Sequence, residues 1–371
     1  MSSLILAFAT QGAGGDDEAR LRDLLSELPV ELFPFQRSQK RGSALQVLQK
    51  LRSRRYELAV MEGTGVAGGL AVILAKWLYG TPYVVSSGDA VAPFLTSRWP
   101  LGKWVFTWYE KLLCSNSAGF IGWTPYLVGR AKHMGAPRGM TAAGWAPYLY
   151  SPSQLAESRL RVRRSLGIPE NALVFGITGS LIWSRRWNYC YGHELVQAAI
   201  RTKNPAVCVL VVGDGGGLSE LKKIAGSRVN STIFLPGRVP REQVPEYLAA
   251  MDVGSLPQSV DDLGSFRYTT KLPEYFSARL PFVTNQIPAA YDLDYGQIWR
   301  LEGNAPWNPR FLQALIDLMD QIRPAAIEQK RSTIPACLPE FDHDRQIART
   351  TAFVQDILSD LQVRGPAVKS V

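Results

Sequence analysis

Several loops in the C-terminal half of the chain combine glycines with cationic or hydroxyl-bearing side chains, a combination that can bind phosphate. Glycines let the backbone approach a ligand closely, and a single guanidinium can hold a phosphate through two parallel hydrogen bonds. The N–H groups at the start of a helix add further donors for an anion. The candidate phosphate ligands of this half are Gly179, Ser180, Arg185, Arg186, Gly213, Tyr268, Thr269, Thr270 and Lys271.

Each of these loops follows a run of apolar residues that has the length of a strand. The runs alternate with amphipathic patterns that predict helices, and they span 173–177, 207–212, 232–235, 253–256 and 280–284. Strands that alternate with helices predict a parallel sheet, and such sheets bind ligands at the carboxyl ends of their strands. We therefore expect the candidate ligands to gather at one edge of a C-terminal sheet.

The N-terminal half repeats this alternation and predicts a second doubly wound sheet. Its strand-like runs span 4–8, 31–35, 56–61, 83–89 and 118–123. Gly14 and Gly15 follow the first run, and they form either a phosphate-binding loop or a tight turn into a helix. Asp89 ends the run at 83–89 and is a candidate site residue for that reason.

Two segments of the C-terminal half have a recognisable amino-acid sequence. Residues 234–253 read FLPGRVPREQVPEYLAAMDV and residues 270–283 read TKLPEYFSARLPFV. The sequence of these segments resembles the donor-binding half of retaining GT-B glycosyltransferases of the family-four type. The resemblance implies an α/β fold with two Rossmann-like, doubly wound domains that face each other across a cleft. It implies an acceptor-side domain at 1–150, a nucleotide-sugar-binding domain at 165–335, and a helix at 340–364 that crosses back to the first domain.

The resemblance also implies roles for individual residues. Gly237 and Arg238 match the turn beside the nucleotide base, and Glu274 matches the carboxylate that binds the ribose hydroxyls. The loop that grips the donor diphosphate begins at Gly179, but Ser180 replaces its first arginine. Phe266 stands where the family carries the first of two glutamates. The implied catalytic residues are Asp89, Arg186 and Glu274, and the implied donor-binding set is Gly14, Gly15, Gly179, Ser180, Arg185, Arg186, Gly213, Gly237, Arg238, Tyr268, Thr269, Thr270, Lys271 and Glu274.

The implied activity is the transfer of a hexose from a nucleotide diphosphate sugar, a UDP-sugar above all, to a lipid-linked or polysaccharide acceptor. No metal and no other cofactor is expected. Two alternatives stay open. One is a nucleotide-sugar epimerase on the same fold. The other is a catalytically degenerate protein that binds nucleotide as a partner or scaffold, which the residues at Ser180 and Phe266 would suit.

The charge balance is basic, with 41 lysines and arginines against 32 acidic residues and a formal net charge of +9. Such an excess suits phosphate-bearing ligands or an anionic membrane surface, and we do not expect nucleic acid as a partner. The segment 94–114 contains Trp99, Trp104 and Trp108 among several cations. This composition predicts either a helix at a membrane surface or an aromatic helix of the core.

The four cysteines are scattered and lack a C-x-x-C motif, which predicts buried free thiols in a reducing compartment. The first residues lack the basic region of a signal peptide, and no apolar run is long enough to span a bilayer. We therefore expect a cytoplasmic protein, with membrane contact at its surface if the tryptophan segment is interfacial. The tail at 364–371 is expected to be disordered.

Overall fold

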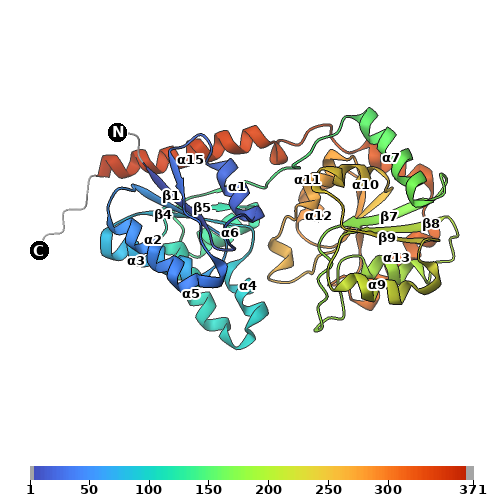
Figure 1. Ribbon diagram of the computed structural model, residues 1–371, viewed down its shortest axis with the longest axis horizontal. Helices are drawn as coiled ribbons and strands as arrows, with labels where there is room; N and C mark the ends of the chain where they lie inside the picture. The colour runs from blue at the N-terminus through green and yellow to red at the C-terminus, as the bar shows by residue number, and fades with distance from the viewer. Residues whose placement is uncertain (1–3, 365–371) are drawn as a thin grey trace, which may run out of the picture. The chain divides into compact units, whose positions relative to one another are not determined.

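The computed structural model describes residues 4–364, so the expectation for the tail falls almost entirely outside the described residues. The chain forms two compact units. The first unit contains the described residues up to Gly144, the short segment Phe266–Tyr268 and the residues from Pro339 onward. The second contains Trp145–Ser265 and Thr269–Leu338. Each unit has a six-stranded parallel sheet of its own, as the alternation of strands and helices predicted (Figure 1).

The sheet of the first unit has the strand order β2-β1-β3-β4-β5-β6. Its strands are β1 Ile5–Ala9, β2 Val30–Leu32, β3 Leu58–Glu62, β4 Tyr83–Ser87, β5 Gly119–Gly122 and β6 Gly139–Thr141. Its helices are α1 Asp16–Leu24, α2 Lys40–Arg52, α3 Val66–Tyr79, α4 Val91–Arg98, α5 Lys103–Ser115, α6 Pro125–His133 and α15 His343–Arg364. α15 packs beside α1, while α2, α3 and α5 form a second layer of neighbouring helices (Figure 1). The short strand β6 had no counterpart in the sequence prediction.

The sheet of the second unit has the order β12-β11-β10-β7-β8-β9. Its strands are β7 Leu173–Thr178, β8 Val207–Val212, β9 Ile233–Gly237, β10 Val253–Leu256, β11 Phe282–Asn285 and β12 Ile298–Leu301. Its helices are α7 Pro152–Leu166, α8 His193–Ala199, α9 Gly217–Ala225, α10 Val244–Ala249, α11 Lys271–Ser277, α12 Ala289–Asp292, α13 Pro309–Gln321 and α14 Pro324–Ser332. A turn of 3-10 helix at Arg241–Gln243 leads into α10.

Both sheets are buried on their two faces, which explains why their strands read as continuous apolar runs rather than as alternating ones. Every residue of β1, β3 and β4 is buried, and so is every residue of β7 and β8. The order of each sheet reverses once. The reversal lies between β1 and β3 in the first unit and between β7 and β10 in the second. Ligands of doubly wound sheets bind at such switch points, outside the carboxyl ends of the strands.

The four cysteines are free, as expected. Cys114, Cys190 and Cys208 are buried, whereas Cys337 is exposed, so the prediction of burial is wrong for that thiol. Cys337 lies beyond α14 in a connecting segment, where no sheet or helix covers it. Among the described residues, no helix combines the length and the apolar character that crossing a membrane requires.

Candidate functional site

The loops that follow β7, β8 and β9 lie side by side at the carboxyl edge of the second sheet. The backbone N–H of Gly179 donates to the carbonyl of Val212 at 2.9 Å, and that of Gly213 donates to the carbonyl of Gly237 at 2.9 Å. The structure thus brings together three glycines that the sequence singled out separately. Their loops present mainly backbone at this edge, which allows a phosphate to approach closely.

Gly213 shows why a glycine is needed where these loops meet. Its φ is +152°, and a Cβ at this position would lie 1.8 Å from the carbonyl oxygen of Gly179. That distance is far below any van der Waals contact, so a side chain would force the two loops apart. The close approach of the loops therefore depends on this residue.

Lys271 brings a cation to the same loops. It is the first residue of α11, its side chain is only 6% exposed, and its Nζ lies 3.0 Å from the point where a Cβ of Gly179 would be. Nζ also lies 4.2 Å from the centre of the Tyr191 ring, a cation–π contact. No acidic side chain of the described residues forms an ion pair with Lys271. Lysine is rarely buried without a counter-charge, so this cation is suited to receive an anionic ligand.

Glu274 lies one turn further along α11 and is partly buried. Burial raises the pKa of its carboxyl group, while the positive charges of Lys271 and Arg241 oppose that rise. The structure thus places the predicted ribose ligand on the same short helix as the predicted phosphate ligand. Thr269 and Thr270 precede the helix, and the Thr269 hydroxyl oxygen is buried without a hydrogen-bond partner among the described residues.

Arg185 and Arg186 lie at the exposed tip of a small hairpin after β7. The backbone N–H of Ser184 donates to the carbonyl of Tyr189 at 2.8 Å and closes this hairpin. The Arg186 guanidinium lies 4.8 Å from the ring centre of Trp187. Ser180 and Arg238 are likewise exposed at the ends of β7 and β9.

In the first unit, the loop after β1 forms the tight turn that the sequence offered as one of two readings. The backbone N–H of Gly14 donates to the Glu18 carboxylate at 2.7 Å. Gly15 is the N-cap of α1, and Asp16, Asp17 and Glu18 fill the first turn of that helix. A phosphate at this helix start would meet three carboxylates, and the Gly14 N–H is already occupied. The geometry therefore favours a structural turn over a phosphate-binding loop.

Asp89 follows β4 and forms an ion pair with the guanidinium of Arg267. Arg267 belongs to the segment Phe266–Tyr268, which the sequence interpretation assigned to the C-terminal domain but which packs in the first unit. The Phe266 carbonyl accepts a hydrogen bond from the Thr124 hydroxyl at 2.8 Å. The Phe266 side chain packs against the core of the first unit. This position thus carries a packing residue where the resembled family has a glutamate.

Tyr268 was expected among the donor ligands, but its ring is buried in the first unit. The ring makes edge contacts with Tyr126 and Phe341, at centroid distances of 5.9 and 6.1 Å. These contacts give the Tyr268 ring a packing role.

A buried charged cluster that the sequence did not predict lies at the switch point of the first unit. Arg20 donates to the Glu62 carboxylate at 2.9 Å, and the Ser86 hydroxyl donates to the same oxygen at 2.5 Å. Burial raises the pKa of Glu62 to about 7, although the Arg20 charge opposes this. Burial likewise raises the pKa of Asp17, which is partly exposed. The signal was present in the sequence, since Glu62 ends an apolar run directly before a Gly-Thr-Gly turn.

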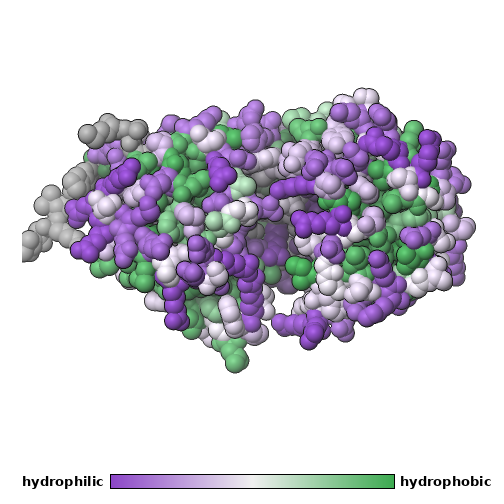
Figure 2. All heavy atoms as spheres, in the orientation of Figure 1, coloured by the Kyte–Doolittle hydropathy of each residue, from purple (hydrophilic) through white to green (hydrophobic). Residues whose placement is uncertain are grey.

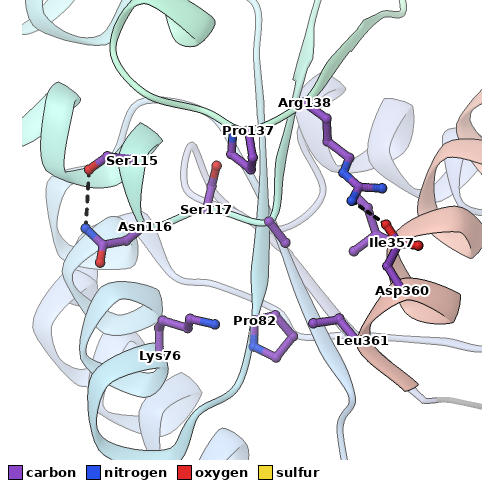
Figure 3. Close-up of a pocket in the computed structure, with 11 residues that line it drawn as sticks. Lys76, Pro82, Ser115, Asn116, Ser117, Pro137, Arg138, Ile357, Asp360 and Leu361 are labelled. Carbon is purple, nitrogen blue, oxygen red and sulfur yellow. Dashed lines mark hydrogen bonds and ion pairs between the residues drawn. The ribbon is translucent and has the colours of Figure 1, made fainter. Parts of the chain in front are cut away.

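A cavity of about 320 Å³ in the first unit lies at the opposite edge of the sheet (Figure 3). Pro82, Ala118 and Arg138 line it, and each directly precedes a strand of the sheet. Arg138 is held there by Asp360 at 2.5 Å. Because parallel sheets bind their ligands at carboxyl ends, this amino-end cavity is not part of the candidate site.

Comparisons with known proteins agree with the geometry of the second unit. A family model described as "Glycosyl transferases group 1" matches residues 172–319. No curated protein sequence matches the chain. Among solved structures, HepE from Anabaena in complex with UDP is 18% identical, has a TM-score of 0.67 and covers 97% of this chain and 100% of its own.

Two further structures share the fold. The α,α-trehalose 6-phosphate synthase of Burkholderia multivorans is 10% identical, with a TM-score of 0.64 and 100% coverage of both chains. The lipopolysaccharide outer core galactosyltransferase WaaB is 12% identical, with a TM-score of 0.61 and coverage of 96% of this chain and 100% of its own. These similarities confirm the predicted GT-B fold. The chain therefore has a GT-B fold, and its residues 172–319 match the family of glycosyl transferases group 1.

Proposed function

We propose that this protein is a retaining glycosyltransferase that takes a hexose from a UDP-sugar and transfers it to a lipid-linked or polysaccharide acceptor. The observation that carries the proposal is the buried Lys271 ammonium group, which lies against the Gly179 loop without an acidic partner among the described residues. A diphosphate would supply the missing negative charge. The choice of uridine is supported by HepE, which was solved with UDP and with UDP-glucose.

The proposed donor site assigns each group of the nucleotide sugar to a part of the second unit. Lys271 neutralises the diphosphate, and the backbone around Gly179 and Gly213 lets the phosphates approach closely. Glu274 accepts hydrogen bonds from the two ribose hydroxyls, because a carboxylate can accept from both at once. Gly237 and Arg238 lie beside the base.

The remaining predicted donor ligands have narrower roles in this proposal. The Thr269 hydroxyl is buried without a partner in the described part of the chain, so it is available to a phosphate oxygen. Arg185 and Arg186 are exposed at their hairpin tip and reach the donor only through their long side chains. We leave Gly14, Gly15 and Tyr268 out of the donor site, for the reasons that their contacts give.

The chemistry follows from where charge develops during transfer. The bond between the sugar C1 and the diphosphate oxygen breaks, and its electron pair stays on the leaving diphosphate. A new bond forms between C1 and the oxygen of an acceptor hydroxyl, whose proton passes to the leaving diphosphate. Lys271 stabilises the negative charge that grows on the leaving group. A positioned charge in a site shielded from water acts strongly on such a transition state.

On the acceptor side, we propose that Asp89 and Asp17 of the first unit bind acceptor hydroxyls. Asp89 has a side chain that is partly exposed, and Arg267 fixes its orientation. The charges of Arg20 and Asp89 both influence the pKa of Asp17, since Arg20 lowers it and Asp89 raises it. The free state of all four thiols supports a cytoplasmic location.

One observation favours a second candidate, a degenerate GT-B protein that binds the nucleotide without turnover. Phe266 replaces the family glutamate and takes part in packing of the first unit. Two measurements together distinguish the active transferase from the degenerate protein. The first is a thermal-shift panel with UDP, GDP, TDP and their sugars, and the second is an assay of UDP release. Stabilisation by UDP together with UDP release supports the transferase. Stabilisation without release, with lipid-linked and oligosaccharide acceptors present, supports the degenerate protein. No stabilisation by any nucleotide would refute both.

A further inference from the structure

The tryptophan segment of the first unit forms a helical hairpin with an outward apolar side. The hairpin consists of α4, a turn of 3-10 helix at Pro100–Gly102, and α5. Leu101 at its turn is fully exposed, at 102% of its reference area, and Trp104 is 87% exposed. The outward apolar side chains are Trp99, Leu101, Trp104, Val105 and Trp108, and each is more than half exposed. We call these five residues the hairpin face.

The opposite side of α5 belongs to the core, so the exposure of the hairpin face is not a sign of poor packing. Tyr109, Leu113 and Cys114 are buried beneath the helix. Glu110 forms two hydrogen bonds with the Arg130 guanidinium, at 2.9 and 2.6 Å, and accepts another from the backbone N–H of Val91. The hairpin is thus fixed to the unit on one side and presents an apolar surface on the other. The sequence offered a membrane-surface helix and a core helix as alternatives, and the structure buries one side of α5 in the core and leaves the other side exposed.

The neighbouring helix α3 extends this apolar character. α3 packs beside α5, and the Trp77 indole N–H donates to the Asn116 side chain at 3.0 Å. The exposed large apolar residues of α3 are Leu70, Leu74, Trp77 and Leu78. Hydrophobic residues also gather toward the protruding end of the α4–α5 hairpin (Figure 2). A soluble surface rarely exposes so many large apolar side chains together unless a partner covers them.

The charges around the hairpin face are of one sign. Within the tryptophan segment 94–114 the basic residues are Arg98, Lys103 and Lys111. The acidic residue of this segment is Glu110, which is buried and held in an ion pair with Arg130. The exposed surface therefore combines aromatic rings, aliphatic side chains and uncompensated cations. Tryptophans at headgroup depth with cations directed to lipid phosphates have this composition.

We propose that the hairpin face docks on the surface of an anionic phospholipid bilayer, with Leu101 and Trp104 entering the boundary between headgroups and acyl chains. A second copy of this chain fits the face less well, because it would bring the same three cations against the first three. The proposal does not rest on the donor site, since docking needs neither nucleotide nor turnover.

The experiment is flotation of the full chain with lipid vesicles in the absence of nucleotide. Vesicles of phosphatidylcholine alone are compared with vesicles that contain about a third phosphatidylglycerol, at about 0.05 M and about 0.5 M salt. We expect binding to the anionic vesicles that weakens at high salt. The double substitution Leu101→Ser with Trp104→Ser should lower the partition coefficient at least about tenfold. Lys103→Gln should lower it about fivefold at low salt.

The matched control is Leu160→Ser. Leu160 is an exposed leucine on α7 of the second unit, with arginines on either side of it in the sequence. It should bind vesicles as the unchanged protein does. Melting temperatures should agree among all four proteins, because the replaced side chains are exposed.

Three outcomes would overturn the proposal. The first is that the unchanged protein does not bind anionic vesicles at low salt. The second is that the double variant binds as well as the control. The third is a dimer of the unchanged protein in size-exclusion chromatography that the double variant converts to a monomer, because the face would then be a protein interface.

Discussion

Replacing Lys271 by methionine tests the donor site directly. Methionine keeps the length and the apolar stem of the lysine side chain but removes the ammonium group. The side chain is 6% exposed and packs over the Tyr191 ring beside Gly179, so the stem matters for packing. A shortened residue such as alanine would mix the loss of charge with the loss of that packing.

The size of the effect follows from the burial of the charge. A hydrogen bond to a charged group contributes about 1.5–3 kcal/mol, and each 1.4 kcal/mol is about a factor of ten in an equilibrium constant. Because Lys271 is buried, bulk water screens this interaction little. We therefore expect the dissociation constant for UDP to rise about ten- to 150-fold in Lys271→Met. The unliganded protein should keep its stability to within about 1 kcal/mol, because the relief from burying an ammonium group without an ion pair offsets the lost attraction to Glu274 and the Tyr191 ring.

The assay is isothermal titration of UDP into both proteins at one fixed salt concentration. Thermal unfolding of the unliganded proteins tests the prediction about stability. Lys222→Met is the matched control, because Lys222 is exposed on α9 of the same unit. Its affinity for UDP should be unchanged.

A refuting result is a dissociation constant for Lys271→Met within twofold of the unchanged protein, with the fold intact. That outcome would mean that the ammonium group does not contact the diphosphate. A loss of affinity accompanied by a large fall in melting temperature would count against the reasoning as well, because it would assign Lys271 to structure.

Three further predictions concern other parts of the molecule. Arg186→Ala should lower kcat/KM for the sugar donor about tenfold, and unchanged steady-state kinetics would remove Arg186 from the site. Gly213→Ala should lower the free energy of unfolding by at least about 2 kcal/mol in urea titrations, whereas Gly216→Ala, with open space around its Cβ and a helical φ, should be neutral. Glu62 has a pKa raised to about 7 in the fold, so the unfolded chain releases this proton first and the contribution of Glu62 to stability falls as pH rises from about 5 to 7. Between about pH 5 and pH 7, the free energy of unfolding should fall less in Glu62→Gln than in the unchanged protein, with a difference of up to about 1.4 kcal/mol per pH unit. An equal fall in the two proteins would contradict this.

The fold could be predicted from the sequence because both sheets are parallel and buried. Buried strands read as short apolar runs, and glycines with polar residues mark the loops between them, as at β7 and β8. The elements that the prediction missed are short. β6 spans Gly139–Thr141 and β12 spans Ile298–Leu301 with two of its four residues not buried. Such edge strands have little apolar signal, since each has a sheet neighbour on one side alone.

The candidate site could be predicted in part. The glycines after β7, β8 and β9 were identifiable because only their residue type and place after a strand were needed. The sequence identified Lys271 as a candidate phosphate ligand, but the burial of its side chain could not be predicted. Its burial depends on Tyr191 and Gly179, which are about 80 and 92 positions earlier in the chain. The packing of Phe266 in the first unit could not be predicted either, because the chain on both sides of Phe266–Tyr268 belongs to the second unit.

The two switch points differ in how their charges are satisfied, and this difference argues for two kinds of ligand. In the first unit, Arg20 is paired with Glu62, and Asp89 is paired with Arg267. A charged ligand there would have to break an ion pair that is already formed, whereas neutral hydroxyl groups can add hydrogen bonds to the oxygens that remain. In the second unit, the Lys271 ammonium group has no acidic ion-pair partner among the described residues, so an anion completes the site instead of competing for it. The charge pattern thus suits a polyhydroxylated acceptor in the first unit and a diphosphate in the second.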